Sequence, residues 1–158
     1  MWRVLLTVMA AALALAAPAA AQDAPWLGAW RLDVGRSDWG PVDPPYSRAT
    51  WTITPIENDD RLRMVYELVG VRGGVTRMEW TGRFDGGDYP MHGPDTPVTY
   101  AYRQVDPLSL QVTVKVDGSV AASSKVTLSP DGRTLTADTE TGHPRFGNIR
   151  NVAVYTKK

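Results

Sequence analysis

The sequence contains no cysteine. This absence excludes disulfide bonds, thiolate metal sites and a thiol nucleophile together. An excess of charge of one sign is also missing, because 17 basic and 17 acidic side chains leave a formal net charge of zero at pH 7. A nucleic-acid-binding protein typically carries a strong basic patch, so the balanced charge argues against nucleic acid as a partner. Without disulfides, the core alone must stabilise the fold.

Helical periodicity and catalytic motifs are missing as well. Beyond the N-terminal segment, no apolar stripe recurs at the three-and-four spacing of an amphipathic helix. The two histidines, His92 and His143, fall in separate expected loops, and neither a Gly-x-Ser-x-Gly nor a His-Glu-x-x-His motif is present. The acidic residues between 59 and 88 do not follow the alternation of a calcium-binding EF-hand loop. We therefore expect no enzyme activity, no metal site and no cofactor.

The N-terminal segment has the pattern of an export signal. Arg3 gives a short basic start, residues 4–17 form an apolar run, and Ala19 and Ala21 satisfy the small-residue rule for cleavage. The run is shorter than the roughly 20 residues that cross a bilayer. The sequence predicts a cleaved signal peptide at residues 1–21 and no stable membrane anchor. Residues 22–158 then form a single domain that is periplasmic or secreted.

The most informative stretch is residues 110–128. Apolar side chains from Leu110 to Val114 and beyond alternate with polar ones, which is the period of a half-buried strand. The pair Asp117-Gly118 then separates two such runs and is typical of a type I′ hairpin turn. Similar runs bounded by turn residues recur along the chain. We expect strands at residues 26–33, 49–54, 61–68, 76–84, 89–92, 98–105, 110–116, 119–128, 134–140 and 151–156.

This pattern predicts an all-β fold. Short links between neighbouring strands require antiparallel pairing, and closing the sheet removes its exposed edges. The sequence predicts an antiparallel up-and-down meander closed into a barrel of about 8–10 strands; a two-sheet sandwich is the alternative. Residues 34–46 and 141–150 are rich in glycine and proline and are expected to be loops.

The expected inner face of the barrel carries large side chains. An apolar pocket with a few polar groups is typical of small-molecule sites, and tyrosine hydroxyls supply such groups. The alternative is that the same side chains fill a small barrel completely. The candidate ligand-binding residues are Trp51, Met64, Tyr66, Met78, Trp80, Tyr100 and Tyr102.

The trio Gly28-Ala29-Trp30 lies in the first expected strand. It resembles the Gly-x-Trp sequence at the start of lipocalins. With the segment Asn151–Tyr155 near the end, the chain is also similar to small exported bacterial lipocalin-like proteins of unassigned function. The resemblance implies a calycin-type barrel, often with a small apolar molecule bound inside. We therefore expect an exported lipocalin-like barrel that binds a small apolar or aromatic molecule in its interior.

The resemblance also implies a barrel floor. In lipocalins the tryptophan of this motif closes one end of the barrel, and an arginine near the last strand packs across it. Trp30 would take the first role here. Arg150 is the expected arginine, with Arg145 as the alternative.

The end loops offer a second function. Loops on rigid barrels commonly carry recognition, and some periplasmic inhibitors are small β-barrels. Arg145 and Phe146 place a cation beside an aromatic ring in the expected loop at residues 141–150, and such pairs are typical anchors of protein interfaces. A periplasmic protein-binding or inhibitor module acting through its end loops is the alternative function.

Overall fold

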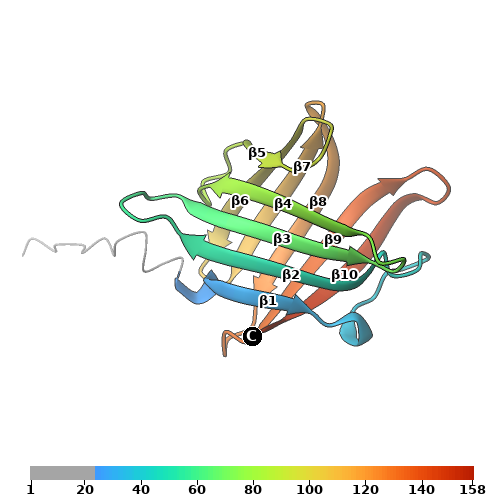
Figure 1. Ribbon diagram of the computed structural model, residues 1–158, viewed down its shortest axis with the longest axis horizontal. Coiled ribbons are helices and arrows are strands. Elements are labelled where there is room, and N and C mark those ends of the chain that lie inside the picture. The colour runs from blue at the N-terminus through green and yellow to red at the C-terminus, as the bar shows by residue number, and fades with distance from the viewer. Residues whose placement is uncertain (1–23) are drawn as a thin grey trace, which may run out of the picture.

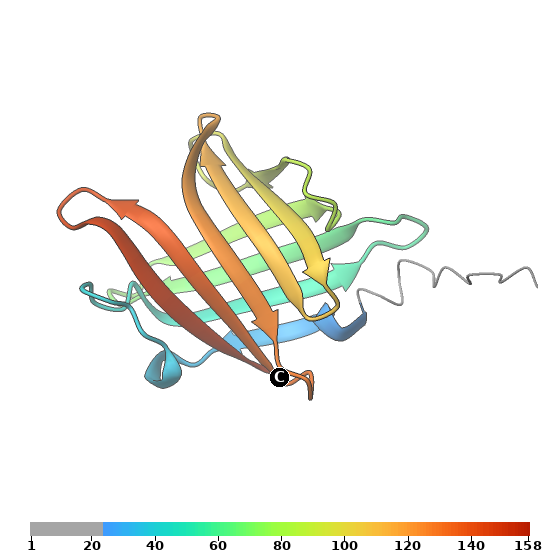
Figure 2. The ribbon, with the colours of Figure 1, turned by 180° about the vertical axis from the view of Figure 1, so that it is seen from behind.

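A computed structural model describes residues 24–158 of the chain; the predicted signal peptide at residues 1–21 lies outside the described residues. The described part is an antiparallel meander closed into a barrel (Figure 1), shown from behind in Figure 2. Each strand pairs with its neighbours in sequence, and the first strand also pairs with the last. Within residues 24–158, no helix is long and apolar enough to cross a bilayer.

Two single-turn 3-10 helices accompany ten strands in the described residues. The helices are η1 (Ala24–Trp26) and η2 (Val34–Arg36). The strands are β1 (Gly28–Leu32), β2 (Tyr46–Pro55), β3 (Leu62–Gly70), β4 (Val75–Gly82), β5 (Tyr89–His92), β6 (Val98–Asp106), β7 (Ser109–Val116), β8 (Ser119–Leu128), β9 (Thr134–His143) and β10 (Gly147–Lys157).

The predicted fold class is confirmed, because the sheet closes on itself and is not divided into two. The predicted turn between β7 and β8 is also confirmed: Asp117 and Gly118 have φ angles of 48° and 79°, as a type I′ turn requires. The predicted loop at residues 141–150 is wrong in extent. His143 pairs with Gly147, so β9 and β10 continue almost to the tip of their hairpin. Pro144 and Gly147 lie at that tip, so they do not end the two strands any earlier.

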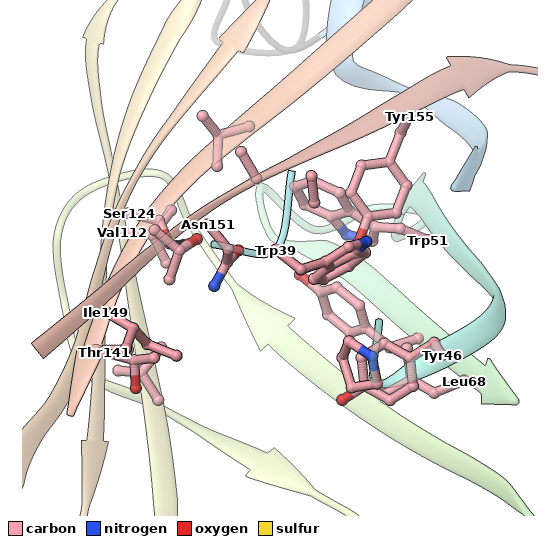
Figure 3. Close-up of a pocket in the computed structure, with 18 of the residues that line it drawn as sticks. Trp39, Tyr46, Trp51, Leu68, Val112, Ser124, Thr141, Ile149, Asn151 and Tyr155 are labelled. Atoms are coloured by element: carbon pink, nitrogen blue, oxygen red, sulfur yellow. Dashed lines mark hydrogen bonds between the residues drawn. The ribbon is translucent and has the colours of Figure 1, made fainter. Parts of the chain in front are cut away.

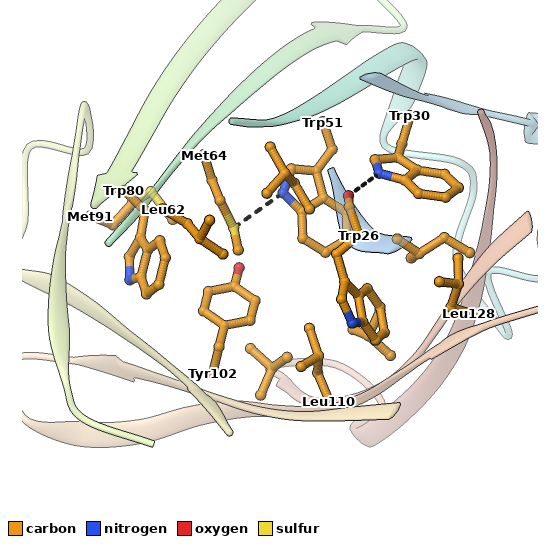
Figure 4. Packing of buried hydrophobic residues seen from close by; sticks show 14 residues of the cluster. Trp26, Trp30, Trp51, Leu62, Met64, Trp80, Met91, Tyr102, Leu110 and Leu128 are labelled. Carbon is orange, nitrogen blue, oxygen red and sulfur yellow. Dashed lines mark hydrogen bonds between the residues drawn. The ribbon is translucent and has the colours of Figure 1, made fainter. Parts of the chain in front are cut away.

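Two tryptophans pack into one end of the barrel (Figure 4). Trp26 and Trp30 are completely buried, and the indole N–H of Trp30 donates a hydrogen bond to the carbonyl of Trp26 at 2.9 Å. Trp26 was expected in the first strand but lies in η1, just before that strand. Gly28 joins the two elements with a φ of 121°, a conformation that residues other than glycine rarely adopt.

The Trp26–Trp30 end is a packed core. The side chains around the two indoles come from both sides of the barrel and are almost fully buried. Together with Trp26 and Trp30 they form what we call the floor. Its other members include Ile53, Leu62, Met64, Trp80, Leu110, Leu128 and Leu135.

The prediction that Arg150 packs across Trp30 is wrong. Arg150 lies inside β10, and its side chain points outward, is 66% exposed and pairs with Asp138 of β9. In β10 the odd-numbered residues face inward, so the cation over Trp30 is Lys157, whose Nζ lies 5.0 Å from the centre of the indole ring. Arg145 lies in the β9–β10 turn at the opposite end of the strand.

The first strand is too short to cover its neighbours. β1 has five residues, whereas β2 has ten and β10 has eleven. Beyond β1, the connection between η2 and β2 takes over the pairing with β10: Asp38 and Val152 exchange backbone hydrogen bonds of 2.8 and 2.7 Å. The Ser37 hydroxyl accepts the Val154 N–H at 3.0 Å. The chain then crosses to the start of β2 at the end opposite the floor.

The buried indole predicts a large stability effect at the floor. Trp30→Ala should lower the free energy of unfolding by roughly 3–5 kcal/mol, because it removes a fully buried side chain and leaves a cavity. Chemical denaturation measures this change. Lys157→Met keeps most of the packing over the ring and should cost less. Arg150→Lys, on the outer face, should leave stability nearly unchanged; a large loss in that variant would contradict the placement of Arg150.

Candidate functional site

The half of the barrel opposite the floor contains a cavity of about 570 Å³. Its lining residues come from β2, β3, β4 and β6 to β10, together with the connection before β2. Five of the predicted ligand-binding residues line it: Trp51, Tyr66, Met78, Tyr100 and Tyr102. The other two, Met64 and Trp80, are completely buried in the floor and do not line the cavity.

Strand register explains this division. The pairs Ile53–Met64, Met64–Trp80 and Trp80–Met91 form one continuous row across β2 to β5. The row above it, two residues along each strand, contains Trp51, Tyr66 and Met78. The first row belongs to the packed floor, and the second forms the base of the cavity.

The cavity has two unlike walls (Figure 3). On one side, Trp51 stacks on Tyr66 with ring centres 5.4 Å apart and an interplanar angle of 18°, and Tyr155 meets Trp51 edge-on at 6.1 Å. The other side is formed by β7 to β10 with mostly small or aliphatic side chains. These are Val112, Val114, Ala122, Ser124, Val126, Ala137, Thr139, Thr141, Ile149 and Asn151.

The polar groups at the base bond to one another. The Trp51 indole N–H donates to the Met64 sulfur at 3.3 Å, and the Tyr66 hydroxyl contacts the same sulfur at 3.7 Å. The hydroxyls of Tyr66 and Tyr102 are directly hydrogen bonded. Buried polar groups normally have such partners. The base is therefore satisfied within the protein and leaves little demand for a ligand group at that depth.

Burial also controls the ionisation of the tyrosines. It raises the pKa of Tyr66 and of Tyr102 well above the usual value. Burial, with smaller effects of the Tyr46 and Tyr100 hydroxyls, raises the pKa of Tyr155 to about 12. Removing a phenol from water disfavours the phenolate. All these hydroxyls are therefore neutral at physiological pH and can donate hydrogen bonds.

Sequence reasoning missed the mouth of the cavity. Trp39 and Asp43 line it from the connection between η2 and β2, which has no periodicity to reveal an inward direction, and Tyr46 lines it from the first position of β2. His143 lines it from the end of β9, and its Nδ1 accepts the backbone N–H of Phe146 at 3.3 Å. Continued alternation along β9 could have placed His143 inward, had the strand been extended that far.

The predicted partner-binding pair lies at the tip of the β9–β10 hairpin. The Arg145 guanidinium lies 5.3 Å from the centre of the Phe146 ring, and the His143 ring stacks on the Phe146 ring with 5.0 Å between centroids. Phe146 is 43% exposed. The second histidine, His92, is exposed on β5 opposite Glu79 and does not line the cavity.

Comparison with known proteins shows the fold and no family. The chain matches no family model and no curated protein. Among solved structures it is similar to the crystal structure of Rv2717c from M. tuberculosis, with a TM-score of 0.57 and 15% sequence identity. The match covers 90% of this chain and 98% of that chain. At this identity the likeness supports the barrel architecture alone.

The buried tyrosines predict loss of stability at high pH. Their pKa values in the folded protein exceed the value of about 10 expected in the unfolded chain, so their contribution is complete below that pH. Above a pH of about 10, Tyr155 ionises in the unfolded chain but stays neutral in the folded protein. Stability therefore falls as the pH rises through the folded pKa of Tyr155, which is about 12. Unfolding midpoints between about pH 9 and about pH 11.5 measure the fall. Tyr155→Phe should show a shallower fall, and an identical one would contradict this assignment.

Proposed function

We propose that this protein is a container that binds a small apolar or aromatic molecule inside its barrel. The observation that carries the proposal is a cavity of about 570 Å³ lined mainly by apolar and aromatic side chains. Small-molecule sites typically have volumes of roughly 300–1,000 Å³ and combine an apolar lining with a few polar groups. The tyrosine hydroxyls and Asn151 supply such groups here.

The architecture supports a container in a second way. Barrel diameter grows with the number of strands, and a barrel of about eight is just filled by side chains or holds one small ligand. Ten strands enclose a wider interior. The floor occupies only one end of it, so the space at the other end is available to a ligand.

The setting proposed for this container is outside the cytoplasm. The proposal rests on the signal-peptide pattern at residues 1–21 and on the resemblance to exported lipocalin-like proteins. The role proposed is binding without catalysis, in the periplasm or after secretion.

Filling the cavity tests the proposal. Ala122→Phe adds a ring at a position that lines the cavity and should weaken binding of an aromatic probe such as naphthalene at least about tenfold, because probe and side chain compete for the same space. Calorimetric titration measures the affinity. Ala121→Phe adds the same ring at the neighbouring exposed position and should bind like the unchanged protein. Equal affinities of all three proteins would place the probe elsewhere.

A second proposal concerns the hairpin tip as a protein-binding site. It is favoured by the exposure of Phe146, which contacts both Arg145 and His143, since exposed aromatic and arginine side chains are typical interface anchors. A partner captured from an exported protein fraction should be lost with the double variant Arg145→Ala, Phe146→Ala. Retention of the partner by this variant would remove the tip from consideration.

A further inference from the structure

The charges around the cavity narrow the class of ligand. Among the described residues that line it, none is lysine or arginine; the ionisable groups other than tyrosine are Asp43 and His143, both at the mouth. A carboxylate that entered the cavity would lose its contacts with water and would find no cation to pair with. Burying an unpaired charge is strongly unfavourable. The interior therefore disfavours anionic ligands, including fatty acids bound by their carboxylate.

The shape of the two walls favours a flat molecule. The Trp51–Tyr66 stack presents an aromatic face, and Tyr100 and Tyr102 continue the aromatic surface with ring centres 6.0 Å apart. The facing wall includes Ser124, Thr141 and other small side chains of β8 to β10 (Figure 3), and Ala122 lines the cavity from β8. Aromatic rings gain from offset or edge contacts with other rings beyond the area they bury. A planar aromatic ligand fits this arrangement better than a flexible chain.

The distribution of hydrogen-bonding groups adds a further requirement. The hydroxyls of Tyr66 and Tyr102 and the indole of Trp51 are occupied at the base. Tyr100 and Tyr155 line the cavity too, and burial is the main cause of their raised pKa values, with no hydrogen bond contributing. Both residues are half-buried and line the open cavity, where their hydroxyls are available as donors. A ligand that keeps water from these donors binds better when it supplies an acceptor of its own.

From these observations we infer that the ligand is an uncharged planar aromatic molecule with a hydrogen-bond acceptor, such as a ring carbonyl, directed at Tyr100 or Tyr155. The inference rests on the proposed function and names its ligand class. It makes Tyr100 and Tyr155 the residues that determine specificity, whereas Trp51 and Tyr66 supply the surface against which the ring lies.

Three naphthalene probes of similar shape separate the requirements: acetylnaphthalene is neutral and has a carbonyl acceptor, ethylnaphthalene has none, and naphthoate is an anion. Calorimetric titration should show naphthoate binding at least about tenfold more weakly than acetylnaphthalene, because its charge finds no partner. Equal or tighter binding of naphthoate would overturn the inference.

The tyrosine variants test the acceptor. Tyr100→Phe combined with Tyr155→Phe should weaken acetylnaphthalene roughly threefold to tenfold, the loss expected for one hydrogen bond, and should leave ethylnaphthalene unchanged. Tyr89→Phe removes a hydroxyl bonded to Asp85 outside the cavity and should affect neither probe. The same loss for both probes in the double variant would show that the hydroxyls serve packing only and would overturn the acceptor requirement.

A flexible anion separates this inference from the proposed function. Dodecanoate should bind more weakly than acetylnaphthalene. If dodecanoate binds and the naphthalenes do not, the container remains and the ligand class is wrong. If neither dodecanoate nor any naphthalene binds, the proposed function fails together with the inference.

Discussion

The length of β1 determines where this barrel is closed and where it is open. With five residues, β1 forms regular pairs with β10 only from Trp30 to Leu32, beside the floor. Backbone groups need hydrogen-bond partners, and farther along β10 they are supplied by Asp38 in the connection before β2. At the floor end, the wall of the barrel is thus a continuous regular sheet. The other end is bordered by an irregular segment, and the cavity lies there.

The two ends also use their polar groups differently. At the floor and at the base of the cavity, Trp30, Trp51 and Tyr66 bond to partners within the protein. Higher in the barrel, Tyr100 and Tyr155 are half-buried and line the cavity, and no hydrogen bond contributes to the raised pKa of either hydroxyl. The first group is therefore satisfied within the protein, whereas the second faces the open space of the cavity.

Much of the fold could be predicted from the sequence, but the position of a residue along the barrel could not. Alternation places Trp51 and Trp80 on the inner face, and both do face inward. It does not show that Trp80 lies one row nearer the floor, because that depends on the stagger between strands. Arg150 was misplaced for a related reason: with the strand taken to begin after it, its side chain had no assigned face. Trp39 lies in an irregular segment, where no period exists.

The separation of the floor from the cavity has a consequence for how such a protein can change. Trp26, Trp30 and Leu135, which hold the barrel together, do not line the cavity. Substitutions at Ala122, which lines the cavity and does not pack against the floor, alter the volume and polarity of the cavity while leaving the floor intact. Natural variation can therefore reshape the cavity without loss of folding, and the same barrel offers protein engineers a wall on which new specificities can be built.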